Sequence, residues 1–172
     1  MWAIPEPKDI EAISRLVRRC DEQCGEWAPR CWMPAPRVAI AARWRQRLTR
    51  PDLWARLVIE DGGLIGVVAC EGACVASLYV EPERSGRGVG SELLRRAERA
   101  MLERRVSDAV LWTPERAPGR RFYERRGWRA DGRRAVSSLS SLPAVAYVKE
   151  LRSSAPAEAV RAGENGAQAP DV

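Results

Sequence analysis

Three glycines at alternate positions, Gly86, Gly88 and Gly90, lie between a predicted strand and a predicted amphipathic helix. Glycine lets the backbone approach a ligand closely, and the first turn of a helix exposes unpaired N–H groups at the positive end of the helix dipole. This arrangement suits a diphosphate, and Arg84 and Arg87 add positive charge. Glycine runs also form plain turns, so it is the strand before and the helix after that favour an anion site here.

The spacing of these glycines differs from two common nucleotide-binding motifs. The dinucleotide fold requires GxGxxG in a βαβ unit, with an acidic residue about 20 positions later. The P-loop requires Gly-Lys followed by Ser or Thr, which this segment lacks.

The chain contains no histidine, which excludes Ser–His–Asp and Cys–His nucleophile systems. Proton transfer must therefore use Glu, Asp, Tyr, Cys, Lys or water. Cys20, Cys24 and Cys31 contain no CxxC pair, and without histidine they do not form a zinc motif, so no metal is expected. Five cysteines without an export signal favour free thiols over a disulfide framework.

Hydrophobic periodicity and the positions of proline and glycine predict elements in the order ααβββαβαββ. Helices are expected over 9–20, 38–48, from the glycine segment to 104, and over 118–126, and strands over 55–60, 64–70, 73–80, 109–113, 135–139 and 144–151. This order indicates a single α+β domain, residues 1–151, with a mixed sheet and helices on both faces. Residues 152–172 contain almost no large apolar side chain and are expected to form a disordered C-terminal tail.

The net charge of +6 is carried almost wholly by arginine and favours an anionic partner, whether nucleic acid, a membrane surface or a polyphosphate cofactor. No apolar run reaches the roughly 20 residues of a membrane helix, and the N-terminus lacks a signal peptide pattern. The expected location is the cytoplasm, and a homodimer remains open.

The segment Ser85–Gly90, S-G-R-G-V-G, resembles the cofactor loop of the GNAT superfamily of N-acetyltransferases, in which Arg or Gln is followed by two residues, Gly, one residue, and Gly or Ala. Ser85 departs from the usual Arg or Gln, and Arg84 could compensate. The resemblance implies a GNAT-like α+β fold with a mostly antiparallel sheet, and a loop that holds the pyrophosphate of acetyl-CoA through backbone N–H groups. The pantetheine arm should pair with the preceding strand. The resemblance assigns to the cofactor Leu78, Tyr79, Val80, Ser85, Gly86, Arg87, Gly88, Val89, Gly90, Ser91 and Arg116.

A second GNAT-like motif follows in the family's order, in RAPGRRFYERRGW at residues 116–128. Phe122-Tyr123-Glu124 and the closing Gly127-Trp128 match the family closely, whereas Arg116 and Gly119 replace its asparagine and alanine. By this resemblance Tyr123 is the general acid. The alternative role of Tyr123 is that of a packed helix aromatic.

The resemblance implies direct transfer of acetyl to a primary amine, a small molecule or a peptide, within a ternary complex. The N–H of Val80 would meet the charge that develops on the thioester oxygen. Trp27, Trp32 and Trp44 either line an acceptor pocket or pack, and the acids Asp21, Glu22 and Glu26 either shape its mouth or form a solvated charge run. Candidate bases are Glu71, Glu81 and Glu26. The rival hypotheses are a non-catalytic CoA-binding sensor or assembly domain, and a basic module that binds nucleic acid such as tRNA.

Overall fold

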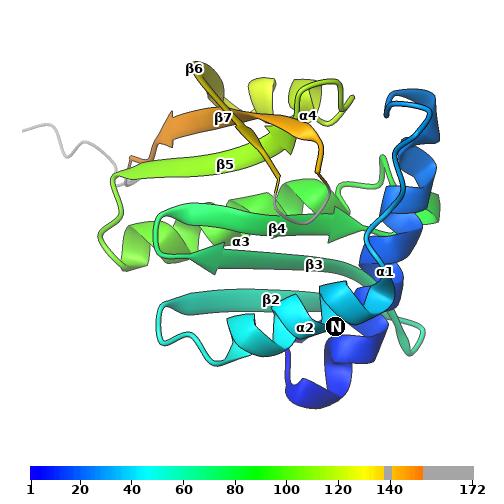
Figure 1. The fold of residues 1–172 in the computed structure, drawn as a ribbon. Coiled ribbons are helices and arrows are strands. Elements are labelled where there is room, and N and C mark those ends of the chain that lie inside the picture. The colour runs from blue at the N-terminus through cyan, green and yellow to red at the C-terminus, as the bar shows by residue number, and fades with distance from the viewer. Residues whose placement is uncertain (138–140, 153–172) are drawn as a thin grey trace, which may run out of the picture.

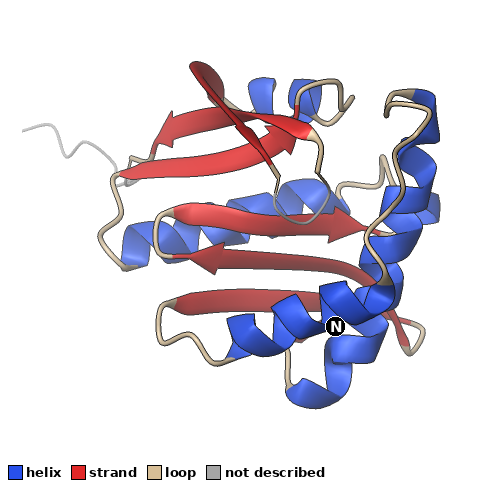
Figure 2. Cartoon of the chain, in the orientation of Figure 1, coloured by secondary structure: helices blue, strands red, loops and turns tan. Residues whose placement is uncertain are grey.

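A seven-stranded sheet passes through the domain with helices on both faces (Figure 1, Figure 2). The computed structural model describes residues 1–137 and 141–152, apart from the side chains of Gly25 and Glu26. The spatial order of the strands is β1-β2-β3-β4-β5-β7-β6. Their bounds are β1 Trp2–Ala3, β2 Leu53–Glu60, β3 Gly63–Glu71, β4 Cys74–Val80, β5 Asp108–Pro114, β6 Arg129–Val136 and β7 Pro143–Glu150.

All neighbouring strands are antiparallel except β4 and β5. The β2–β3 hairpin turns through Asp61 and Gly62, with φ of 51° and 74°, and the β3–β4 hairpin turns through Gly72, with φ of 56°. A positive φ is readily adopted by glycine, which explains why the chain reverses within so few residues at these points.

Two hydrophobic cores lie on opposite faces of the sheet. Helices α1 (Ile10–Glu22) and α2 (Arg37–Leu48) cover the face toward the viewer in Figure 1, and α3 (Val89–Glu103) covers the other. Ile13, Ile40 and Val67 are fully buried on the α1–α2 face, and Leu93 and Tyr147 on the α3 face. The apolar stripes of the helices thus hold both faces of the sheet away from water.

The predicted fold class is confirmed: the domain is α+β, with a mixed, mostly antiparallel sheet between helices. The strand expected over 135–139 is wrong in its bounds, because β6 begins at Arg129. Every residue of β6 is exposed, and its register shifts between Ala130 and Arg134, so the alternation that reveals a strand is missing. The last helix, α4 (Arg120–Glu124), is also shorter than expected.

The two-residue strand β1 was not predicted, since it is too short to show a period. It pairs with β2 through Trp2 and Val58. The predicted tail, apart from Arg152, lies outside the described residues.

Candidate active site

The parallel strands β4 and β5 are joined only at their beginnings. Cys74 pairs with Val110 and Val75 with Leu111, and no further pair follows along the two strands. The register of β3 and β4 shifts between Ala69 and Cys70, which leaves a bulge in β4. Bulges bend and twist a strand, and β4 and β5 separate beyond this point (Figure 1). The edge of β4 that faces β5 is therefore open over its second half.

Backbone polar groups line this open edge. The N–H of Glu81 donates to the carbonyl of Ile65 over 2.8 Å, just beyond the end of β4. Antiparallel strands alternate between hydrogen-bonded and non-hydrogen-bonded pairs, so the next bonded residue on β4 is Tyr79. Leu78 and Val80 consequently direct their N–H and C=O groups away from β3, toward the gap before β5. An extended ligand with amide groups can pair with this edge as an added strand.

The glycine loop follows directly. A single 3₁₀ turn, Pro82–Arg84, ends β4, and Gly86 and Gly88 then adopt φ of 78° and 86°. Gly88 is the N-cap residue of the 15-residue helix α3, whose first hydrogen bond runs from Glu92 N to Gly88 O. The N–H groups of the first turn have no acceptor within the helix and point out of its N-terminus beside the loop.

The charged residues of the loop differ from expectation. Arg84 lines the pocket beside the loop, but its charge is already paired: it forms an ion pair with Glu60 at 2.7 Å and lies 3.7 Å from Asp61. Arg126, after α4, donates to the hydroxyl of Ser91 at the start of α3 and to the carbonyl of Phe122. An arginine just beyond the end of α4 thus contacts the first turn of α3.

A pocket of about 570 Å³ unites the β4 edge, the glycine loop and α4. Its lining includes ten of the residues that the sequence singled out: Leu78, Tyr79, Val80, Arg84, Ser85, Gly86, Gly88, Gly90, Ser91 and Tyr123. Sequence reasoning did not identify the remaining members as site residues: Cys20, Gly119, Phe122, Arg125 and Arg126. The two arginines adjoin the Phe122-Tyr123-Glu124 motif, which was the available signal for them.

Three predicted cofactor residues lie elsewhere. Arg87 is exposed and does not line the pocket, and Val89 packs its side chain against the core under α3. Arg116 is exposed beside a separate pocket formed with Trp27 and Pro143. The structure therefore does not bring Arg116 to the glycine loop.

Tyr123 projects from α4 into an aromatic cluster at the wall of the pocket. Its ring lies 5.1 Å from Phe122, 6.5 Å from Trp128 and 6.4 Å from Tyr147, measured between centroids. Burial raises the pKa of its phenol to about 12. Within the described residues no hydrogen bond of the Tyr123 hydroxyl is found, so the group is available to a ligand.

Neighbouring polar contacts hold α4 in place. The buried Tyr147 donates its hydroxyl hydrogen to Glu124 Oε1 at 2.6 Å and accepts from Arg120 Nε at 2.9 Å. Arg120 also donates to the carbonyl of Glu115. Both ends of the short helix are thus tied to β7 and to the end of β5, which fixes the direction of the Tyr123 ring.

A second pocket, of about 410 Å³, lies on the α1–α2 side of β4. Tyr79 lines both pockets, and the consecutive residues Cys20 and Asp21 line the first and the second. The two pockets therefore meet at the end of α1. Trp27, Trp32 and Trp44 all line the second pocket, as does Trp112, which sequence reasoning missed because it lies in a strand far along the chain.

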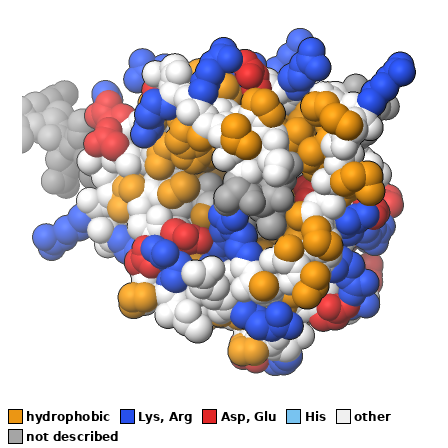
Figure 3. All heavy atoms as spheres, in the orientation of Figure 1, with side chains coloured by type: hydrophobic (Ala, Val, Ile, Leu, Met, Phe, Trp, Pro, Cys, Tyr) orange, Lys and Arg blue, Asp and Glu red, His pale blue; other side chains and the backbone are white. Residues whose placement is uncertain are grey.

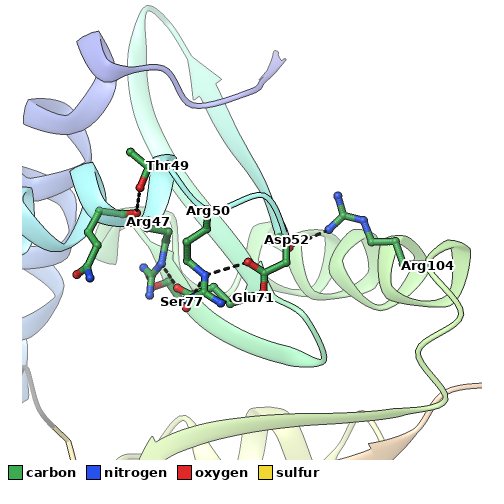
Figure 4. A network of polar contacts seen from close by, with 8 residues as sticks. Arg47, Thr49, Arg50, Asp52, Glu71, Ser77 and Arg104 are labelled. Atoms are coloured by element: carbon green, nitrogen blue, oxygen red, sulfur yellow. Dashed lines mark hydrogen bonds and ion pairs between the residues drawn. The ribbon is translucent and has the colours of Figure 1, made fainter.

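The acids differ in their availability. Glu71 forms an ion pair with the buried Arg47 and lies 3.5 Å from Arg50, in a polar network that also reaches Ser77 on β4 (Figure 4). Glu22 forms an ion pair with Arg18 at 2.7 Å and does not line either pocket.

Asp21 lines the second pocket, and burial raises its pKa to about 6. Glu81 lies 2.9 Å from Arg19, and burial raises its pKa. The side chain of Glu26 lies outside the described part of the structure.

No group of three or more His, Cys, Asp or Glu side chains could hold a metal ion in the part of the chain that the structure describes. In the same residues, no helix is long and apolar enough to cross a bilayer.

The central part of the chain resembles a known family in sequence. Residues 53–130 match the model of the acetyltransferase (GNAT) domain, which confirms the resemblance to the GNAT superfamily. This stretch runs from β2 through the glycine loop to the second motif. No curated protein matches the chain in sequence.

Solved structures share the fold over nearly the whole domain. A GCN5-related N-acetyltransferase from Rhodopseudomonas palustris is similar with a TM-score of 0.72 and 20% identity, over 88% of this chain and 95% of that one. The PaiA N-acetyltransferase from Thermoplasma acidophilum, in complex with coenzyme A, has a TM-score of 0.63 and 17% identity, over 87% and 98%. An aminoglycoside 6'-N-acetyltransferase complexed with coenzyme A gives 0.64 and 15%, over 88% and 97%. The chain therefore has the GNAT fold, and its residues 53–130 match the acetyltransferase (GNAT) domain model.

Proposed function

We propose that the protein is an acyl-CoA-dependent N-acyltransferase that transfers acetyl from acetyl-CoA to a primary amine by direct attack in a ternary complex. The observation that carries this proposal is the single pocket in which the open β4 edge, the glycine loop and Tyr123 meet. The GNAT family match supports it, as do fold neighbours named as N-acetyltransferases. The proposal includes a cytoplasmic location and no metal.

The residues of this pocket suit acetyl-CoA. The N-terminus of α3 and the open backbone of Gly86 and Gly88 present N–H groups to a diphosphate. Leu78 offers a backbone donor and a backbone acceptor to the amides of a pantetheine arm, which leaves the N–H of Val80 for the reacting carbonyl. Arg125, at the pocket wall, supplies positive charge for the phosphate of coenzyme A that lies outside the diphosphate.

In the proposed reaction the acceptor nitrogen attacks the thioester carbonyl from the side of the second pocket. The C–N bond forms, the C–S bond breaks, and the thiolate departs into the first pocket. The N–H of Val80 is the donor that meets the negative charge on the carbonyl oxygen, because it points into the gap beside β5. Tyr123 then protonates the departing sulfur.

The environment of Cys20 supports the need for an acid. This thiol lines the same pocket, and burial raises its pKa to about 12. A thiolate that departs into such a site is destabilised in the same way, so it accepts a proton more readily than in water. The pKa of Tyr123, about 12, keeps its phenol protonated at neutral pH and ready to donate.

The basic surface does not favour the nucleic-acid alternative. On the polar side of α3, Arg95 and Arg96 both form ion pairs with Glu92, and Arg99 pairs with Glu103. Arginines neutralised by acids on their own helix contribute little to a continuous field that attracts phosphates.

Two measurements test the proposal. Calorimetric titration should detect acetyl-CoA binding by the wild-type protein, and release of free CoA thiol should accompany incubation with a suitable primary amine. Normal acetyl-CoA binding without turnover of any amine would favour the sensor hypothesis instead. Salt-sensitive binding of tRNA in the absence of acetyl-CoA binding would favour the nucleic-acid hypothesis.

A further inference from the structure

The second pocket is placed where an acceptor must enter. It lies against the face of β4 opposite α3, and it meets the cofactor pocket at Tyr79 and at the end of α1. A nitrogen that attacks an acyl group beside Val80 has to arrive through this junction. The acceptor's body then occupies the 410 Å³ volume behind it.

Of the two carboxylates that line this pocket in the described residues, one is available to bind a ligand. The two acids are Asp21 and Glu71. Glu71 is held by Arg47 and Arg50 in the network of Figure 4. Asp21 forms no ion pair or hydrogen bond through its carboxylate within the described part of the chain, and it adjoins the junction. One available carboxylate in a pocket that two cations, Arg43 and Arg47, also line suits a monocation rather than a polycation.

The walls of the pocket are aromatic. Trp27 and Trp32 come from the segment after α1, and Trp112 comes from β5, where its side chain is 40% exposed. Figure 3 shows hydrophobic side chains gathered on this face over both regions. Indole rings pack well against flat aromatic groups and also attract cations.

We propose that the acceptor is a primary monoamine carried on a planar aromatic group, with Asp21 binding its ammonium group and Trp27, Trp32 and Trp112 enclosing its ring. This inference rests on the proposed N-acyltransferase function and deepens it. Asp21 acts in binding and also as the first proton acceptor, since the amine must be neutral to attack.

The ammonium group loses two protons when it becomes an amide N–H. One proton passes to Asp21 and from there to solvent. The second returns through solvent to the Tyr123 phenolate, which has given its own proton to the thiolate. The elevated pKa of Asp21, about 6, makes it a stronger base than an exposed carboxylate while leaving it mostly ionised at neutral pH.

The groups around Asp21 account for this behaviour. Burial is the main cause of its raised pKa; on its own helix Arg18 opposes the shift and Glu22 adds to it. Facing it are the Cys24 thiol and, from β4, the Tyr79 phenol, whose pKa values are raised by burial and further by the charge of Asp21. Arg43 and Arg47 of α2, and Glu71 of β3, also line the pocket.

The experiment compares three amines with acetyl-CoA while CoA thiol release is followed. Phenethylamine is the aromatic probe, cyclohexylethylamine matches its size without a flat ring, and spermidine is the polycation. We expect kcat/KM to be highest for phenethylamine, by roughly three- to tenfold over cyclohexylethylamine, which is the range of aromatic pairing. In Trp112→Leu this ratio should fall toward one.

Asp21→Asn and Glu22→Gln form a matched pair, since they neutralise adjacent acids of which only Asp21 lines the pocket. Asp21→Asn should lower kcat/KM for phenethylamine by a factor of roughly 30 or more, with unchanged acetyl-CoA affinity. Glu22→Gln should change neither quantity.

Acetylation of spermidine or cyclohexylethylamine in preference to phenethylamine would overturn this inference and leave the proposed function standing. Acetyl-CoA binding without acetylation of phenethylamine would overturn it as well. Failure to bind acetyl-CoA would instead refute the proposed function itself.

Discussion

The thiol of Cys20 donates a hydrogen bond to the carbonyl of Val80 over 3.2 Å. Through this contact the end of α1 touches the open edge of β4, at the point where the cofactor pocket and the acceptor pocket meet. A backbone carbonyl that would otherwise lack a strand partner is satisfied by a side chain 60 residues away.

A prediction about thiol reactivity follows. Burial raises the pKa of Cys20 to about 12, that of Cys24 to about 11 and that of Cys70 to about 12, whereas Cys31 is exposed. Because the thiolate is the reactive form, iodoacetamide at about pH 8 should label Cys31 first. Mass spectrometry of the native protein should find one rapidly modified peptide, and in urea all five cysteines should react. Rapid labelling of Cys20 in the folded protein would contradict the buried contact with Val80.

The glycine loop yields a second prediction. Gly88 has φ of 86°, and a Cβ added there would meet no atom within 4 Å. Gly88→Val is therefore unfavourable because of its backbone conformation and not because of crowding in the free protein. The mutant should lose about 1–2 kcal/mol of folding free energy and bind acetyl-CoA much more weakly, since the loop can no longer present its N–H groups.

Gly62→Val is the matched control for this change. Gly62 lies in the β2–β3 turn with φ of 74°, also with open space around its Cβ position, and it lies outside the cofactor pocket. The control should lose similar stability in thermal unfolding and keep its acetyl-CoA affinity in calorimetry. Equal affinity in both mutants would remove the glycine loop from the site.

The glycine loop and the short aromatic helix could be predicted from the sequence, because each consists of residues that are neighbours in the chain. The sequence could not predict that Asp21 and Trp112 line the same pocket, because this depends on how α1 packs on the sheet relative to β5. The engagement of Arg84 by Glu60 escaped prediction for the same reason: its partner lies in another hairpin. Arginines in a loop sequence indicate a positive electrostatic potential there. Which of them form ion pairs, and with which acids, depends on the tertiary structure.

Two tyrosines in ring contact are expected to separate catalysis from stability. Tyr123→Phe removes a hydroxyl without a partner among the described residues, so stability should change little. Its kcat in single-turnover kinetics should fall by a factor on the order of 10² to 10⁴, with a much smaller change in acetyl-CoA affinity. Tyr147→Phe breaks bonds to Glu124 and Arg120, and it should cost about 1–3 kcal/mol in urea unfolding. A Tyr123→Phe mutant with the wild-type chemical rate would show that Tyr123 only packs.

The buried carboxylate of Asp21 gives a prediction that does not depend on any substrate. Its pKa is raised from 3.8 to about 6 in the folded protein, mainly by burial. The folded state therefore favours the protonated form, so this group's stabilising contribution is present below pH 3.8 and is lost as the pH rises through about 6. Asp21→Asn removes the penalty of a buried charge, and it should raise the free energy of unfolding by about 1–3 kcal/mol near pH 8. Near pH 4 the mutant and the wild type should differ little.

Urea unfolding at the two pH values measures both free energies of unfolding. Glu22→Gln is the control and should change neither value, since Glu22 is exposed and forms an ion pair with Arg18. A gain in stability combined with a loss of amine acetylation would indicate that Asp21 is retained for function at the expense of folding. A loss of stability near pH 8 would instead show that the Asp21 carboxylate has a partner within the folded protein and is not available to an acceptor.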